Sequence, residues 1–95
     1  MALDVNEDHK ITRQEAQDFI DNFAGNVGGS EIRGGFFNKN PLIELLNQNG
    51  CIGLRYYYGT NSAGDPVLVL FGVDEQEHDI DSIILEKSSP WPPNH

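Results

Sequence analysis

Two β-rich runs separated by a turn-forming segment constrain the fold of this chain most strongly. Residues 51–58 and 66–73 consist mainly of aliphatic and aromatic side chains, and residues 59–65 between them include Gly, Asn, Ser and Asp. Apolar runs of this length joined by a short segment rich in turn formers predict a β-hairpin. A polar segment at residues 74–79 then leads into a third apolar run at residues 80–86. We therefore expect a three-stranded antiparallel β-meander.

The register of this hairpin can be predicted, because directly opposed residues share a face and a slip of one residue exchanges the faces. Pairing Cys51 with Asp74 opposes four apolar pairs on one face: Ile52 with Val73, Leu54 with Phe71, Tyr56 with Val69, and Tyr58 with Val67. The reverse face then contains Gly53, Arg55, Tyr57, Leu68, Leu70, Gly72, Ile83 and Leu85. Both faces are apolar, so the face that the helices leave open needs a second copy of the chain, the segment at residues 36–37 or the C-terminal tail.

Two short helices are predicted before the sheet. The first begins with a capping box, in which Thr12 and Glu15 satisfy each other's backbone N–H groups. Three apolar residues follow at helical spacing, and Gly25 marks the end of the helix after about three turns. These apolar residues are Phe19, Ile20 and Phe23.

The second predicted helix has Asn40 as its N-cap, Pro41 at its first position and Gly50 as its stop. Its apolar stripe consists of Leu42, Ile43, Leu45 and Leu46. Residues 31–37 between the helices are predicted to be irregular, and the side chains of Phe36 and Phe37 are predicted to be buried in the core. The Pro-Trp-Pro-Pro run at residues 90–93 is predicted to form an extended tail, because proline cannot continue a strand ladder. The predicted fold class is therefore α+β.

The charge balance excludes several classes of function. The chain has 95 residues, with 15 acidic and 6 basic side chains and a formal net charge of −9, so nucleic acid and anionic membranes would repel it. We expect neither among its partners. No apolar run reaches the roughly 20 residues of a membrane span, and the first residues lack the basic and apolar parts of a signal peptide. These features predict a cytoplasmic protein.

A chain of this size is expected to form one domain. We expect residues 1–95 to fold as a single small domain, with an acidic, flexible N-terminal segment at residues 1–10 and an extended tail at residues 88–95. Cys51 is the only cysteine, which excludes an internal disulfide and a cysteine-rich zinc site within one chain. The acidic residues are concentrated within residues 4–21 and 74–81, which leaves the predicted hairpin nearly uncharged.

One N-terminal motif has the spacing of a calcium-binding EF-hand loop. Such loops present oxygen ligands to Ca²⁺ at alternate positions over twelve residues. The six candidate ligands are Asp4, Asn6, Asp8, the carbonyl of Lys10, Thr12 and Glu15. His9, however, stands where these loops favour glycine, and no predicted helix precedes the motif. The alternative is an acidic segment followed by a capping box, in which Glu15 serves the helix and binds no metal. Ca²⁺ is the only cofactor that the sequence suggests.

A catalytic site is a weaker interpretation. Cys51 lies at the same end of the predicted sheet as the turn at residues 74–79, so Cys51, His78 and either Asp74 or Asp79 are candidates for a nucleophile, a base and an orienting group. An isolated cysteine between a helix and a strand is more often a buried apolar residue, and a histidine among acids in a turn is usually solvated. We therefore expect a non-enzymatic protein, with a Cys51-dependent activity as the alternative.

Three stretches of the chain are similar to one group of short bacterial proteins. They are residues 34–37 (Gly-Gly-Phe-Phe), residues 45–59 with the pattern Gln-x-Gly-Cys-x-Gly-Leu-Arg, and residues 66–74 (Pro-Val-Leu-Val-Leu-Phe-Gly-Val-Asp). The chain resembles this group of Bacteroidota-type proteins over residues 11–93. No activity, cofactor or partner is established for the group, so the resemblance implies a bacterial intracellular protein and no particular reaction. Members often carry extra cysteines near the C-terminal Pro-Pro, where this chain has Trp91, Asn94 and His95.

These features together favour a protein–protein interaction or structural module. We expect it to form a homodimer and to bind a protein partner, whose identity the sequence does not give, through apolar surfaces of the sheet and tail. The alternative, from a different class of function, is a weak calcium-binding module that uses the loop at residues 4–15.

Overall fold

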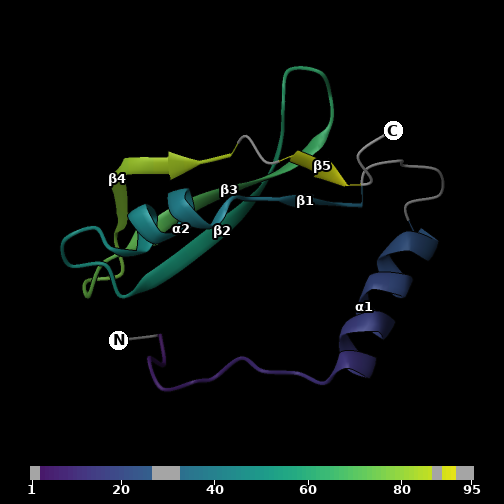
Figure 1. Ribbon diagram of the computed structural model, residues 1–95, viewed down its shortest axis with the longest axis horizontal. Coiled ribbons are helices and arrows are strands. Elements are labelled where there is room, and N and C mark those ends of the chain that lie inside the picture. The colour runs from purple at the N-terminus through teal and green to yellow at the C-terminus, as the bar shows by residue number, and fades with distance from the viewer. Residues whose placement is uncertain (1–2, 27–32, 87–88, 92–95) are drawn as a thin grey trace.

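The computed structural model describes residues 3–26, 33–86 and 89–91, without the side chains of residues 24–26 and 91. Along the chain, the elements are α1 (Arg13–Asn26), β1 (Gly34–Phe36), α2 (Lys39–Leu46), β2 (Gly53–Thr60), β3 (Pro66–Val73), β4 (Asp79–Leu85) and β5 (Ser89–Trp91). The three long strands form an antiparallel sheet in the order β2-β3-β4 (Figure 1). The predicted α+β fold, with two helices and a three-stranded meander, is confirmed. A second sheet, formed by β1 and β5, was not predicted.

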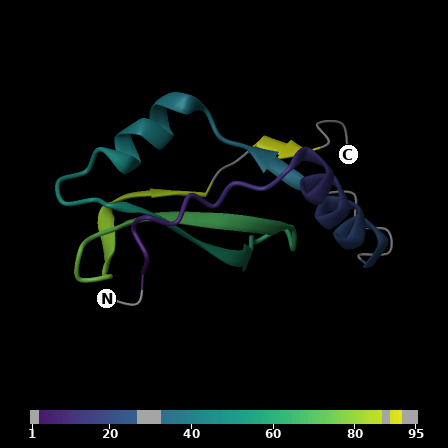
Figure 2. The ribbon, with the colours of Figure 1, turned by 90° about the horizontal axis from the view of Figure 1, so that it is seen from below.

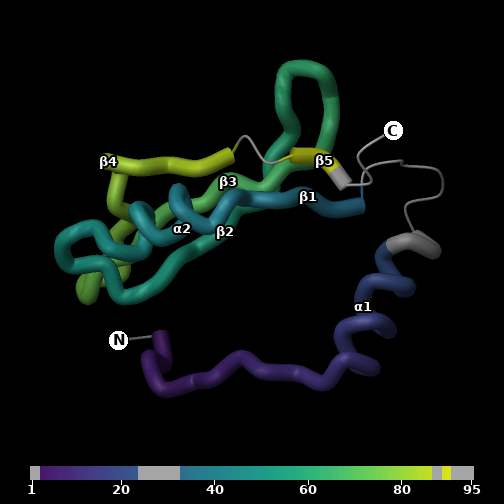
Figure 3. Tube along the Cα trace, in the orientation of Figure 1, coloured from purple at the N-terminus to yellow at the C-terminus, as the bar shows by residue number. Residues whose placement is uncertain are grey.

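Helix α1 begins at the predicted capping box. The Glu15 N–H donates to Thr12 Oγ1 over 3.0 Å, and the Thr12 N–H donates to Glu15 Oε1 over 3.0 Å. The apolar stripe of this helix stays in solvent, with exposed fractions of 61% for Phe19, 57% for Ile20 and 51% for Phe23. Figure 3 shows α1 set to one side of the sheet. The expectation that both helices cover one face of the sheet is therefore wrong for α1.

Helix α2 starts two residues earlier than predicted. Its N-cap is Asn38, whose backbone is extended at φ −65° and ψ 152°, and its side chain makes no capping hydrogen bond. Pro41 occupies the third helical position, where its missing N–H is harmless because the first-turn N–H groups have no partner within the helix. Leu45 is fully buried against the sheet. Gly50 then takes a left-handed conformation, with φ 79°, in the turn that leads to β2.

The predicted register of the β2–β3 hairpin is wrong by one residue. Val73 pairs with Gly53, whereas the sequence favoured Ile52. The Ile52 N–H nevertheless donates to the Val73 carbonyl over 2.8 Å. Ile52 and Gly53 on the β2 side therefore both oppose Val73 on β3, as in a β-bulge. The shift places Leu54, Tyr56 and Tyr58 on the face that α2 covers, and Arg55 and Tyr57 on the other face.

A break in the β3–β4 ladder is bridged by the side chain of Gln48, which lies just after the end of α2. Phe71 pairs with Ile84 but Gly72 pairs with Ile80, so residues 81–83 have no partner in β3. The Ile83 N–H donates instead to Gln48 Oε1 over 3.1 Å, and Gln48 Nε2 donates to the Leu45 carbonyl over 2.8 Å. Gln48 thereby connects the end of α2 to the bend in β4, and it satisfies a backbone group that the sheet leaves unpaired.

The segments at residues 34–36 and 89–91 pair with each other. Gly35 lies opposite Pro90, and Phe36 lies opposite Ser89. The expectations that residues 31–37 are irregular and that Pro90 makes no ladder are therefore wrong for these residues. Proline is tolerated because each strand of a two-stranded sheet has a free edge toward which the missing N–H can point. Phe36 is 59% exposed and does not belong to the core, whereas Phe37 is half-buried. Residues 92–95 lie outside the described residues.

The buried apolar core of the described residues is small, and Leu45 and Leu70 belong to the side of the sheet that α2 covers. In the described part of the chain, Leu45, Leu70 and Val73 are the buried hydrophobic side chains. Figure 2 shows α2 on one side of the three-stranded sheet, and neither described helix lies against its other side. Neither described helix is long and apolar enough to cross a membrane.

Candidate interaction surface

The sheet face opposite α2 presents aromatic and aliphatic side chains to solvent. Tyr57 on β2 is 42% exposed and Ile84 on β4 is 48% exposed, while Phe71 and Val69 on β3 between them are half-buried. The rings of Tyr57 and Phe71 meet edge to face, with centroids 5.6 Å apart. We call this set, together with Arg55, the open face. A contiguous exposed apolar patch on a small domain often marks a site that binds another molecule.

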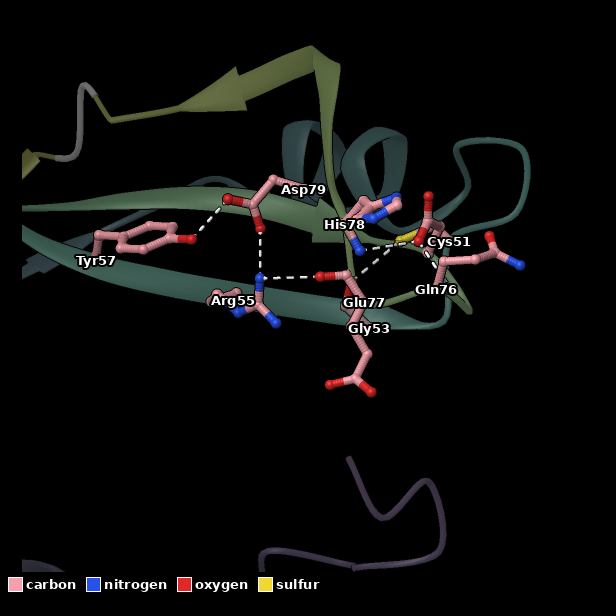
Figure 4. A network of polar contacts seen from close by, with 9 residues as sticks. Cys51, Gly53, Arg55, Tyr57, Gln76, Glu77, His78 and Asp79 are labelled. Carbon is pink, nitrogen blue, oxygen red and sulfur yellow. Dashed lines mark hydrogen bonds and ion pairs between the residues drawn. The ribbon is translucent and has the colours of Figure 1, made fainter. Parts of the chain in front are cut away.

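A polar cluster holds the β2 side of the open face in place (Figure 4). Arg55 Nη1 lies 2.8 Å from Asp79 Oδ1 and donates a longer bond of 3.4 Å to the Glu77 carbonyl. The Tyr57 hydroxyl donates to the other carboxylate oxygen, Asp79 Oδ2, over 2.6 Å. One carboxylate on β4 therefore anchors two neighbouring side chains of β2 across the central strand.

This cluster keeps its charges paired. The Tyr57 hydroxyl and, after it, the charge of Asp79 raise the pKa of Arg55, while its partial burial acts in the opposite direction. The guanidinium is therefore cationic at neutral pH, as arginine is in proteins generally. Because its ring is held by Asp79 and Phe71, Tyr57 can make contact with a partner at little additional cost in side-chain entropy.

The face that α2 covers also has an exposed end. Beyond the helix, the exposed fraction is 53% for Tyr56 and 84% for Tyr58, and their rings meet edge to face at 5.6 Å. A hydrogen bond with Tyr56 is the main cause that raises the pKa of Tyr58. Both faces of β2 therefore carry tyrosines, as the sequence predicted, but these side chains are exposed to solvent, and the predicted register gave them the wrong partners in β3.

An open groove lies where the two sheets meet. It has a volume of about 350 Å³, and its apolar lining comes from the end of β1, the first turn of α2 and the end of β4. The apolar residues that line it are Phe36, Phe37, Pro41, Ile84 and Leu85. Ile84 lines this groove and also belongs to the open face, so the two surfaces share this residue.

Several of the candidate calcium ligands make local hydrogen bonds within the N-terminal segment. The Asp4 and Asp8 side chains accept hydrogen bonds from the backbone N–H groups of Asn6 and Lys10, at 3.0 and 3.1 Å. Among the described residues, no group of three or more His, Cys, Asp or Glu side chains is placed to hold a metal ion. Glu15 caps α1, and its bonds with the Thr12 backbone and then the Thr12 hydroxyl lower its pKa. One feature does match a calcium loop: His9 has φ 58°, at the position where glycine is favoured.

The residues of the candidate thiol site make hydrogen bonds with other groups. The half-buried Cys51 donates through Sγ to the Gly53 carbonyl over 3.1 Å. Asp74 Oδ1 accepts hydrogen bonds from the backbone N–H groups of Gln76 and His78 and so shapes the turn. Asp79, the other candidate acid, binds Arg55 and Tyr57. No hydrogen bond recorded for the described residues joins Cys51 to His78.

The contacts of Arg55 and Tyr57 with Asp79 were not predicted from the sequence. The available signal was a single arginine in an otherwise uncharged strand, because a charge on a half-buried strand needs a partner.

In comparisons with known proteins, no family model, no curated protein and no solved structure matches the chain. The resemblance to a bacterial group therefore remains a hypothesis.

Proposed function

We propose that this domain is a non-enzymatic protein-interaction module that acts as a homodimer and binds a protein partner through the open face. The observation that carries the proposal is the placement of Tyr57, Phe71 and Ile84 on a sheet face that no described helix covers. Tyrosine and arginine are the residue types that most often dominate binding energy in interfaces. The open face holds one of each, and Asp79 fixes both.

The net charge of −9 restricts the kind of partner. A negatively charged ligand would be repelled, whereas a protein with an apolar, neutral or basic surface would not. The acidic side chains at residues 74–81 lie beside the open face, so a partner with basic residues around an apolar centre would fit best. This pattern of an apolar centre with a polar rim is typical of protein interfaces.

The experiment compares two isoleucine variants of similar exposure. Ile84 on the open face and Ile43 on α2 are exposed by 48% and 41%. We expect proteins captured from a lysate of cells that express the chain to be retained by the wild type and by Ile43→Lys but lost with Ile84→Lys. If both variants capture the same set as the wild type, the open face is not the binding surface. A mass of 10.6 kDa by light scattering at every concentration would refute the homodimer.

A calcium-binding module is the second candidate, and it is favoured by the left-handed conformation of His9. Calorimetric titration of CaCl₂ into the protein at millimolar concentration would show saturable heat, which Glu15→Gln abolishes if Glu15 is a ligand. Glu7→Gln, at a loop position that supplies no ligand, is the matched control and would leave the heat unchanged. No saturable heat with the wild-type protein would rule out this candidate.

A further inference from the structure

The outer edge of β2 has the features of a strand that pairs with another chain. β2 lies at one edge of the three-stranded sheet, and over all eight residues it pairs with β3 alone among the described strands. Apart from the bulge at Ile52, which precedes the strand, its register with β3 is regular from Gly53 to Thr60. A long, regular edge strand offers a row of N–H and C=O groups to a further strand.

The hydrogen bond that closes the β2–β3 hairpin shows which N–H and C=O groups of β2 point to its outer edge. The Asn61 N–H donates to the Asp65 carbonyl over 3.0 Å, and this pair is in register with the β2–β3 ladder. In an antiparallel ladder, hydrogen-bonded pairs alternate with pairs that are not hydrogen-bonded. The odd-numbered residues of β2 therefore bond to β3, while the N–H and C=O groups of Leu54, Tyr56 and Tyr58 point away from the sheet.

Among the described residues, the β4 edge of the sheet is protected and the β2 edge is not. β4 bends where residues 81–83 lack partners in β3, it carries Asp81, and its Ile83 N–H is already bound by Gln48. Bulges and charged side chains are the devices by which proteins block edge-to-edge pairing. β2 contains no proline and one charged residue, Arg55, whose charge is neutralised by Asp79.

The low charge of β2 allows a second copy of the chain to reach this edge, and symmetry favours a second copy as its occupant. Two molecules that each carry a charge of −9 repel each other, so they can associate only through a surface without excess negative charge. β2 is such a surface, whereas β4 and the turn before it are acidic. Pairing of β2 with β2 also closes after two copies, because each contributes the same patch, while pairing of β2 with β4 would continue into a filament.

We propose that β2 of one copy pairs antiparallel with β2 of a second copy, which joins the two sheets into one six-stranded sheet. This inference rests on the homodimer of the proposed function and specifies how it forms. The two open faces then become parts of one continuous surface, with Arg55 and Tyr57 of both copies near its centre. Tyr56 and Tyr58 of both copies lie side by side on the opposite surface.

The test compares two substitutions of Tyr58 that differ in one hydrogen-bond donor. Tyr58→Pro and Tyr58→Ala both remove a ring that is 84% exposed, but only proline removes the outward-facing N–H. We expect Tyr58→Pro to weaken the dimer at least about tenfold relative to Tyr58→Ala, which corresponds to about 1.4 kcal/mol, when both are measured by sedimentation equilibrium. Circular dichroism spectra of both variants verify that the sheet is retained.

Hydrogen exchange gives a second measurement that needs no variant. In the wild-type protein, exchange of the Tyr56 and Tyr58 amides should slow with rising protein concentration, while the Tyr57 amide, already bonded to β3, should not change. Added salt should strengthen the dimer, because it screens the repulsion between acidic copies. A dimer that is equally strong in Tyr58→Pro and Tyr58→Ala, with concentration-independent exchange at Tyr56, would overturn the edge pairing and leave the homodimer standing. A monomer at all concentrations would overturn both.

Discussion

The replacement of Gly72 by alanine tests how α2, β3 and the turn after α2 fit together. A Cβ atom at this position would lie 2.8 Å from Gln48 Nε2, 3.0 Å from Cys51 Sγ and 3.3 Å from the carbonyl oxygen of Leu45. The first of these contacts is shorter than any that real side chains adopt, so Gln48 must move. The Leu45 carbonyl belongs to the helix backbone and cannot easily retreat. The methyl group therefore displaces Gln48 from its place between α2 and β4.

The cost can be worked out from the contacts that are lost. Overpacking of a well-packed site costs about 1–3 kcal/mol. Displacement of Gln48 removes its bonds to Ile83 and Leu45, at about 0.5–1.5 kcal/mol each. The reduced freedom of the unfolded chain returns about 0.4–1 kcal/mol when glycine becomes alanine. We expect a net loss of about 1–5.6 kcal/mol in the free energy of unfolding, and a melting temperature lower by at least about 4 °C.

Urea denaturation followed by far-UV circular dichroism measures this loss. Gly53→Ala is the matched control, because a Cβ there meets no heavy atom within 4 Å. In the double variant Gly72→Ala with Gln48→Ala, the combined loss should be smaller than the sum of the two single losses, since both changes break the same bonds. If Gly72→Ala is within about 0.5 kcal/mol of Gly53→Ala, the interpretation of Gln48 as a bridge between α2 and β4 is refuted.

Two further predictions concern α1 and the polar cluster. Because the pKa of Glu15 is lowered in the folded protein, its carboxylate stabilises α1 above the unfolded-state pKa, near 4.5. This contribution disappears as the pH falls through the folded-state pKa. Amide exchange of residues 13–26 should therefore accelerate in acid for the wild type, and Glu15→Gln should show no such step. Tyr57→Phe removes the 2.6 Å hydrogen bond to Asp79 and should lower the free energy of unfolding by about 0.5–1 kcal/mol. Tyr58→Phe, the control, should lower it by less. Equal urea midpoints for the two variants would contradict the anchoring role of Asp79.

Local sequence signals predicted the elements well because those elements depend on neighbouring residues. The capping box of Thr12 and Glu15 fixes the start of α1 through bonds that span three residues. The strands of the meander follow from their apolar composition and from the turn formers between them. The N-cap of α2 was misplaced because proline is tolerated throughout the first turn, so Pro41 could not distinguish Asn38 from Asn40.

The register and the candidate site depend on contacts between residues far apart in sequence. Both possible registers of the hairpin give two apolar faces, so the pattern could not choose between them, and the bulge at Ile52 decided the outcome. The partnership of Arg55 with Asp79 spans 24 positions and two strands. Likewise, the strand formed by residues 34–36 depends on residues 89–91, more than fifty positions later. No local pattern contains such information.

The ion pair between Arg55 and Asp79 connects the stability of the fold to its proposed use. On its own, Arg55 would place a charge in the middle of an edge strand, which is one of the ways in which proteins prevent strands from associating. Asp79 removes that protection, because it binds the guanidinium at 2.8 Å and draws it across β3 toward the acidic edge. The same bond aligns Tyr57 on the open face. A single carboxylate on β4 therefore leaves β2 without an unpaired charge, and this is the condition under which two acidic copies can meet along that edge.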